Sequence, residues 1–236
     1  MDSFTAPSGY HRIKLVASFD ELVTARLENG VNALCWPRAL PGDFREVVEK
    51  LGANDGVTPL DDLRLSALTL SAAGCIARDI MLADKRRLEE RSLSPELNCI
   101  SSYPREEQPA PVPIDVYSFH ADSAPVEADT YLCTYFGAPS EGLRNEEAQR
   151  RVDIPETRTA LLKLFGGNDG EAFSDYLNEN CYDLHYAPLP SARPFSFGLG
   201  NLWRIALDYP GNPVPPCIHR APENRPEDPP RLLLIS

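Results

Sequence analysis

Residues 112–122 read VPIDVYSFHAD, and this stretch decides the fold that the sequence predicts. Apolar and polar residues alternate along it with a period of two, as in a β-strand with one buried face. The predicted inner face carries Val112, Ile114, Val116, Ser118, His120 and Asp122, and the outer face carries Asp115, Tyr117 and Phe119. A strand whose inner face ends in a histidine and a carboxylate suits a barrel with a metal ion at its mouth.

The β-prone character continues to the C-terminus. Further strands are predicted within DTYLCTYFG, PFSFGLGNLWRIALD, VPPCIHRA and PRLLLIS, which turn-rich segments separate. Pro155 and Gly166 bound a predicted helix, and EAFSDYLNEN predicts a second one, so a helical insertion is expected around residues 155–180. We therefore expect residues 101–236 to form a double-stranded β-helix core of the jelly-roll or cupin-like type.

Residues 1–100 are predicted to be a mainly helical support region with short strands between the helices. In SFDELVTARLENG, Ser18 and Glu21 have the spacing of a capping box, and Gly30 is expected to end the helix. Together with the β-rich half, this region predicts one α+β domain that spans residues 1–236.

Two further helices are expected in this support region. The first is short and lies around Asp43 to Leu51. The second is long: Thr58 is placed as its cap, Pro59 stands at its first position, and apolar residues recur at helical spacing as far as Glu90.

Composition excludes several classes of protein. The net charge of -12 repels phosphate backbones and anionic lipid, so neither nucleic acid nor a membrane is an expected partner. No apolar run approaches the ~20 residues that cross a bilayer. The opening MDSFTAPSGYHRIKL lacks the pattern of a secretory signal, so a cytoplasmic location is expected. The 6 cysteines are widely spaced and are expected to be buried free thiols.

Three residues are the candidate metal ligands: His120, Asp122 and His219. In a strand, residues i and i+2 project from the same face, so His120 and Asp122 can bind one ion together. His219 follows much later in VPPCIHRAP, and Arg231 follows it in PPRLLLIS.

This order resembles the Fe(II)- and 2-oxoglutarate-dependent oxygenases. The resemblance implies that the three ligands occupy one face of a ferrous ion and leave three positions for 2-oxoglutarate and O₂. It implies that Arg231 pairs with the far carboxylate of 2-oxoglutarate, and Tyr135 is a second candidate for binding this co-substrate. Retention of Asp122 favours hydroxylation or oxidative demethylation over halogenation, and the expected substrate is a small molecule or an amino-acid-like compound.

The chain also resembles a bacterial family known as domain of unknown function eighteen twenty-six. The resemblance lies in VNALCWPRALP, in FHADSAPVEADTYLCTYFGAPSEGL, and in IHRAP with RLLLIS. The residues that match its specific positions are Thr134, Tyr135, Gly137, His219, Arg220 and Pro222, besides the H-x-D pair. Two positions depart from the patterns: Pro139-Ser140-Glu141-Gly142 replaces the usual glycine-threonine-glutamate-tryptophan, and Leu233 stands where oxygenases often carry a small hydroxyl residue.

Some alternatives stay open. Asp183 and His185 have the same i,i+2 spacing and form a rival set with His219, although His185 is better interpreted as a histidine with a local hydrogen bond. Arg220 and Arg225 also lie near His219, but Arg220 is expected to face away from the metal. The same ligands suit zinc, so a cupin-like metal-binding protein without oxygenase activity is the second hypothesis, and a metal-free interaction domain is the third.

Overall fold

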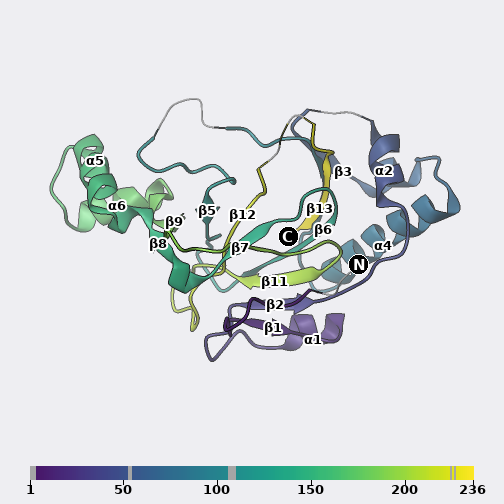
Figure 1. Ribbon diagram of the computed structural model, residues 1–236, viewed down its shortest axis with the longest axis horizontal. Coiled ribbons are helices and arrows are strands. Elements are labelled where there is room, and N and C mark those ends of the chain that lie inside the picture. The colour runs from purple at the N-terminus through teal and green to yellow at the C-terminus, as the bar shows by residue number, and fades with distance from the viewer. Residues whose placement is uncertain (1–3, 53–54, 106–109, 224, 226) are drawn as a thin grey trace.

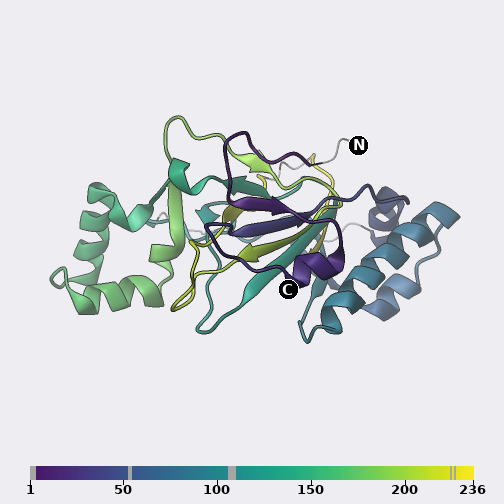
Figure 2. The ribbon, with the colours of Figure 1, turned by 90° about the horizontal axis from the view of Figure 1, so that it is seen from below.

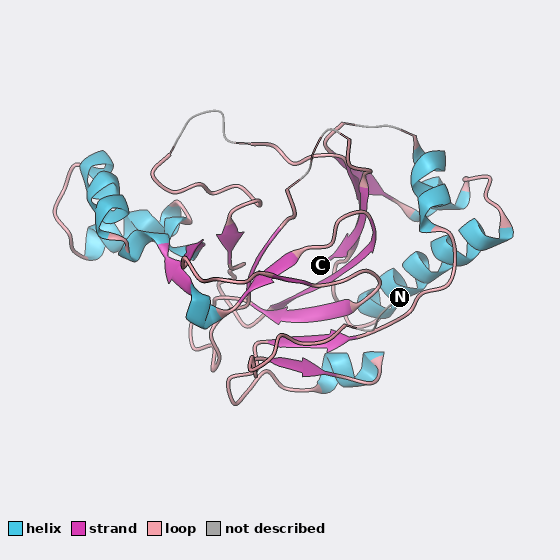
Figure 3. Ribbon diagram, viewed as in Figure 1, coloured by secondary structure: helices cyan, strands magenta, loops and turns pink. Residues whose placement is uncertain are grey.

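The computed structural model describes residues 4–52, 55–105, 110–223, 225 and 227–236. These residues form two β-sheets with helices at both ends of the molecule, which confirms the predicted mixed α+β class (Figure 1, Figure 3). Within this described part, no helix is both long and apolar enough to cross a membrane.

The larger sheet has seven strands. Their order is β1 (Ile13–Leu15), β2 (Ala33–Trp36), β11 (Leu202–Ala206), β6 (Asp129–Phe136), β13 (Arg231–Ile235), β4 (Glu96–Ile100) and β3 (Val57–Leu60). Only the β1–β2 pair among these is parallel. Residues 1–100 do contain the four helices α1 to α4 with the short strands β1 to β4 between them, and these strands belong to the larger sheet. Of these, β2 and β4 pair with strands from the C-terminal half.

The smaller sheet has six antiparallel strands. Their order is β10 (Phe195–Ser196), β7 (Glu141–Leu143), β12 (Ile218–Arg220), β5 (Phe119–His120), β9 (His185–Pro188) and β8 (Ala148–Arg150). Strands β4 to β7 belong in turn to the larger and the smaller sheet, and so do strands β10 to β13 in the reverse order. The chain thus crosses repeatedly between the two sheets, which lie next to each other (Figure 1).

The helices come from two parts of the chain. The N-terminal half forms α1 (Phe19–Thr24), which lies beside β2, and α2 (Phe44–Leu51), α3 (Asp62–Ser66) and α4 (Ala72–Glu89). The predicted insertion forms α5 (Pro155–Phe165) and α6 (Glu171–Glu179), with 3-10 turns η1 (Asn145–Glu147), η2 (Arg151–Asp153) and η3 (Tyr182–Leu184) around it. Figure 2 shows α2 and α4 at one end of the molecule and α5 and α6 at the other, with the sheets between them.

The main hydrophobic core lies between α2, α4 and one face of the larger sheet. It includes Val47, Met81, Leu88, Leu97, Leu232 and Leu234, which are nearly or fully buried. Because side chains alternate along a strand, Arg231, Leu233 and Ile235 of β13 face the other way. The second face of the larger sheet is therefore free to form a cavity with the smaller sheet.

The predicted long helix from Thr58 to Glu90 is wrong. Thr58 and Pro59 lie in β3, which pairs with β4. The helical spacing that follows belongs to α3 and α4, each with its own cap: Asp61 accepts a hydrogen bond from the Arg64 amide, and Ser71 accepts one from the Gly74 amide. Strand pairing with a distant segment outweighed the local helix signal.

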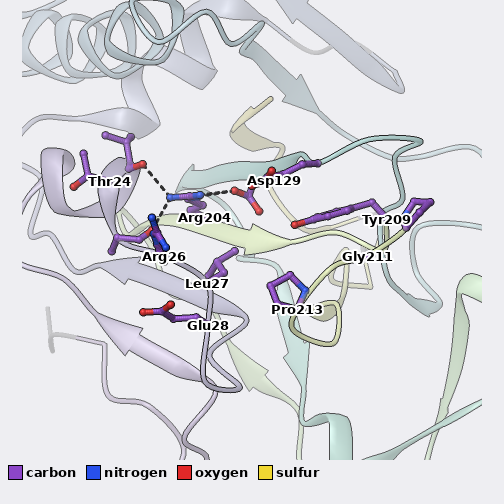
Figure 4. Close-up of a pocket in the computed structure, with 13 residues that line it drawn as sticks. Thr24, Arg26, Leu27, Glu28, Asp129, Arg204, Tyr209, Gly211 and Pro213 are labelled. Carbon is purple, nitrogen blue, oxygen red and sulfur yellow. Dashed lines mark hydrogen bonds and ion pairs between the residues drawn. The ribbon is translucent and has the colours of Figure 1, made fainter.

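The first helix begins as predicted but ends early. Ser18 caps α1 by accepting a hydrogen bond of 3.1 Å from the Glu21 amide. The helix ends at Thr24 and not at Gly30, because Arg204 donates to the last carbonyls, those of Leu22, Val23 and Ala25. The same guanidinium forms a 2.7 Å ion pair with Asp129. Figure 4 shows Arg204 between Asp129 on one side and the end of α1 on the other.

The predicted strand over residues 112–122 is also largely wrong. Only Phe119 and His120 are in a strand. Oδ1 of Asp115 accepts hydrogen bonds of 3.1 Å from the backbone amides of Tyr117 and Ser118, which makes a turn of the kind that aspartate favours. The alternation of residue types in this segment is therefore not a strand pattern, although His120 does point inward as expected.

A candidate metal centre

The structure brings the three predicted ligands together. Strands β5 and β12 pair so that His120 lies directly opposite His219, with ring centroids 4.6 Å apart. Asp122 follows β5. Its Oδ1 lies 3.8 Å from Nε2 of His120, and its Oδ2 lies 3.8 Å from Nε2 of His219. One ligand atom from each of the three residues lies within 4.8 Å of the others, so the group can hold a metal ion. We call these residues the triad.

Each triad side chain is oriented by a second hydrogen bond. Nδ1 of His120 lies 2.7 Å from the carbonyl oxygen of Ser118, and Nδ1 of His219 lies 3.3 Å from that of Cys217. When Nδ1–H donates to a carbonyl, the lone pair of Nε2 stays available for a metal. Thr130 donates a 2.7 Å hydrogen bond to Oδ2 of Asp122. Metal-binding residues commonly have such supports, and the nitrogen and oxygen donors suit Fe(II) or Zn(II).

The electrostatics of the triad also favour a cation. Burial, and then the nearby His219, lower the pKa of His120 to about 4. Burial alone would raise the pKa of Asp122, but His219, His120 and the Thr130 hydrogen bond together hold it below its ordinary value. At neutral pH His120 is therefore neutral and Asp122 is ionised, which are the forms that bind metals.

The rival set with Asp183 and His185 does not assemble. His185 lies beside His120 on β9, with ring centroids 5.7 Å apart, and its Nδ1 is 3.2 Å from the Ser118 hydroxyl. The prediction of a histidine with a local hydrogen bond is confirmed. The Asp183 side chain instead lies 3.8 Å from Arg150.

A cavity of about 190 Å³ adjoins the triad. The larger sheet contributes Val57, Asn98, Ile100, Leu132, Arg231, Leu233 and Ile235 to its wall, and Tyr103, Val116, Ser140 and Ala221 complete it. Ile235 pairs with Leu132, near Thr130 and therefore near the triad. Arg231 lies four residues back along β13, which is about 13 Å at the rise of a strand. The cavity wall thus extends from the metal ligands to a guanidinium.

Arg231 is a buried cation without an anionic partner in the described part of the chain. It is 1% exposed, and it contacts the hydroxyl of Ser140 at 3.0 Å and that of Tyr103. Its Nε has no hydrogen-bond partner among the described residues. Burial lowers the pKa of Arg231, and Tyr103 opposes this effect. A charge in such surroundings is costly unless an anion joins it, so this end of the cavity suits a carboxylate.

Other arginines have different surroundings. Arg38 is also buried, but it forms a 2.7 Å ion pair with Asp84. Arg220 pairs with Glu141 at 2.7 Å on the other side of its strand, as expected for a residue next to His219. Arg225 is exposed. Of the three arginines that the sequence offered near His219, only Arg231 lines the cavity.

Tyr135 lies apart from the triad. It is on the face of β6 that packs against the helices, where its ring stacks on Phe44 and its hydroxyl donates a 2.9 Å hydrogen bond to Asp84. Its predicted contact with a co-substrate is not supported by this placement. The tyrosine beside Arg231 is Tyr103, which sequence reasoning missed because it lies in a polar, proline-rich connection without a strand pattern.

A larger hollow lies elsewhere on the molecule. It has a volume of about 630 Å³ and lies between the segment after α1 and the turn at residues 209–213 (Figure 4). Two arginines line it: Arg204 is already bound to Asp129 and to backbone carbonyls, and Arg26 is exposed. No triad residue lines it, so the chemistry of the chain is assigned to the smaller cavity.

Neither a scan against protein-family models nor searches of curated proteins and of solved structures found a match for this chain. The family resemblances described from the sequence therefore stay predictions.

Proposed function

We propose that the chain is an Fe(II)- and 2-oxoglutarate-dependent oxygenase that hydroxylates a small molecule. One observation carries the proposal: the triad lines the same cavity as Arg231, a buried cation without an anionic partner among the described residues. A metal-binding group alone suits many proteins. A metal-binding group with a buried cation at the other end suits a ligand that binds metal through one carboxylate and has a second carboxylate for the arginine.

The proposal includes the finer assignment of the fold as a double-stranded β-helix. Successive strands β4, β5, β6 and β7 alternate between the larger and the smaller sheet, and so do β10, β11, β12 and β13. The orders β4-β13-β6-β11 and β5-β12-β7-β10 are those of two four-stranded sheets wound together. In this interpretation β1, β2, β3, β8 and β9 extend the two sheets, and α5 and α6 lie in an insertion.

In this proposal each part of the cavity has a task. His120, Asp122 and His219 would hold the ferrous ion, and Arg231, whose guanidinium Ser140 and Tyr103 contact, would pair with the far carboxylate of 2-oxoglutarate. The apolar wall excludes water; it includes Ile100, Leu132 and Leu233. Bound Fe(II) with 2-oxoglutarate and O₂ supplies the oxidising power, and the protein supplies placement.

The test is reconstitution of the metal-free protein with Fe(II) and 2-oxoglutarate, first without oxygen. We expect a weak visible charge-transfer band, and succinate once O₂ is admitted. Asp122→Ala should abolish both signals because it removes a ligand. Arg231→Met should raise the 2-oxoglutarate concentration needed for them at least tenfold, because a charge-assisted pair is lost.

Asp183→Asn is the matched control, because it changes the carboxylate of the rival set. It should leave Fe(II) affinity and succinate formation unchanged. Tight binding of zinc with neither the band nor succinate would reject the oxygenase and favour the cupin-like metal-binding protein. Unchanged Fe(II) affinity in Asp122→Ala would remove Asp122 from the triad.

A further inference from the structure

We propose that Arg151 binds a carboxylate group of the substrate beside the triad, so that the substrate is a small organic acid. This inference rests on the proposed function. It names the substrate class and a binding residue that the sequence patterns do not include.

The half-buried side chain of Arg151 has no partner for its charge in the described part of the chain. Its Nε–H is buried without an acceptor, and the guanidinium makes neither a hydrogen bond nor an ion pair with a described residue. Arg144 and Arg231 also have a buried, unpaired Nε, but Arg144 lies 3.8 Å from Glu147 and Arg231 contacts the Ser140 hydroxyl. Burial lowers the pKa of Arg151, and no described acidic group opposes this effect. A guanidinium in such surroundings calls for an anion that the protein does not supply.

Three histidines form a row across the smaller sheet. His219 pairs with His120 across β12 and β5, and His120 pairs with His185 across β5 and β9. Directly paired residues project from the same face of a sheet, so all three imidazoles lie on the face that carries the triad. We call these three residues the histidine row.

Arg151 continues the histidine row. Arg150 of β8 pairs with Tyr186 of β9, so the next residue, Arg151, lies opposite His185. Because side chains alternate along a strand, Arg151 projects from the face opposite to that of Arg150, which is the face of the row. Burial, His120 and then Arg151 lower the pKa of His185, as expected for a cation close to this imidazole. Neighbouring strands are about 4.8 Å apart, so the backbone of Arg151 lies about 10 Å from that of His120. A long side chain and a small ligand can bridge this distance.

The opposite end of the histidine row is closed by aromatic rings. Gly142 of β7 pairs with His219 and has no side chain. The rings of Phe195 and Phe197 occupy the place that a Cβ of Gly142 would take. One end of the row thus offers apolar rings, whereas the other offers a cation. A charged group of a substrate that lies over the triad is therefore expected toward Arg151.

A carboxylate suits this end of the row. The planar fork of a guanidinium matches the two oxygens of one carboxylate. In the proposed function the far carboxylate of 2-oxoglutarate pairs with Arg231, which lines the cavity along β13. Arg151 is thus left for the second reactant, the substrate.

The experiment is NMR of the full chain with isotope-labelled arginine, loaded with Zn(II), saturated with 2-oxoglutarate and then titrated with sodium acetate. We expect the Nε–H signal of Arg151 to shift with saturation at acetate concentrations on the order of 10–100 mM, the range for one hydrogen bond to a charged group. Acetamide has nearly the same shape without the charge and should leave the signal in place, as should sodium chloride at equal ionic strength. The variant Arg151→Met identifies the signal.

The melting temperature gives a second readout. Because a ligand that binds only the folded chain stabilises it, acetate should raise the Tm of the wild type above its value in sodium chloride, and this difference should vanish in Arg151→Met. The variant itself should keep or raise the Tm in chloride, because it removes a half-buried charge without a partner. The matched control is Arg150→Met, whose Nε donates to the Asp183 carbonyl at 3.1 Å; it should keep the acetate effect. Arg151→Lys keeps the charge without the fork and should bind acetate more weakly than the wild type.

The outcomes separate the two proposals. If 2-oxoglutarate does not move the Nε–H signal of Arg231, the proposed function fails and this inference fails with it. If 2-oxoglutarate moves that signal but acetate shifts the Arg151 signal no more than acetamide does, only the inference is overturned. A lower Tm in Arg151→Met with an unchanged acetate effect would assign Arg151 to the fold.

Discussion

His120 lies directly opposite His219 on the antiparallel strands β5 and β12, and their ring centroids are 4.6 Å apart. Successive side chains alternate between the two faces of a sheet, so a register shift of one residue would turn one imidazole to the opposite face. The β5–β12 register thus fixes the two nitrogen ligands, and Asp122 needs only to follow β5 by two residues to complete the triad.

The metal-free protein should lose stability as the pH falls from about 6.5 to about 4. Burial lowers the pKa values of His120 and His185 to about 4, so below pH 6.5 the unfolded chain binds protons that the folded chain does not. Each histidine can contribute about 3 kcal/mol to this loss. The pKa of Asp122 is lowered from its ordinary value of 3.8, so this carboxylate adds a further loss of stability mainly below about pH 4. Urea unfolding in a chelator at several pH values measures the effect.

The variants His185→Gln and His11→Gln test this assignment. His185→Gln should flatten the pH dependence, whereas His11→Gln, at an exposed position, should leave it unchanged. A free energy of unfolding that is constant between pH 6.5 and 4.5 would contradict the prediction.

Thr130→Val should weaken metal binding while the ligands themselves stay in place. The substitution removes the 2.7 Å hydrogen bond that orients Asp122 and helps to lower its pKa. Loss of such an outer contact commonly lowers metal affinity about 10- to 100-fold. Titration with Mn(II) measures it. Thr134→Val, at the threonine that follows Thr130 on the same face of β6 after Leu132, is the control and should bind Mn(II) like the wild type.

Tyr135→Phe should destabilise the fold and leave 2-oxoglutarate affinity unchanged. Its hydroxyl donates to the buried Asp84 carboxylate, and loss of this hydrogen bond should lower the free energy of unfolding by about 1–3 kcal/mol. Tyr103→Phe should instead weaken 2-oxoglutarate binding roughly two- to tenfold, because Tyr103 contacts Arg231. Weaker binding in Tyr135→Phe at unchanged stability would restore Tyr135 as a co-substrate contact.

Arg204→Met should lower the free energy of unfolding by about 2–4 kcal/mol. The substitution leaves the half-buried Asp129 without its ion pair. It also leaves three backbone carbonyls at the end of α1 without this hydrogen-bond donor. Urea unfolding measures the change. The control is Arg26→Met, at an exposed position in the same hollow, which should change stability by less than about 0.5 kcal/mol. Equal stability of the two variants would show that Arg204 does not hold α1.

The sequence by itself determined the features that depend on residues close together along the chain. The strands β6, β11, β12 and β13 follow from residue types and turn positions, and the cap Ser18 and the short helix from about Asp43 to Leu51 follow from local patterns. The identity of the candidate ligands was also readable, because H-x-D places two donors on one side and His219 and Arg231 follow in a recognisable order.

Only the tertiary structure decided which of the candidates meet. Thr58 and Pro59 became part of a strand because β4 pairs with them, α1 ended early because Arg204 reaches its carbonyls, and Tyr135 turned toward the helices. Likewise, Asn98 and Tyr103 joined Arg231 at one cavity although they lie far from it in the sequence. The physical reason is that local propensities are worth about 1 kcal/mol or less per residue, whereas strand pairing, buried ion pairs and burial of side chains are set by distant parts of the chain and outweigh them.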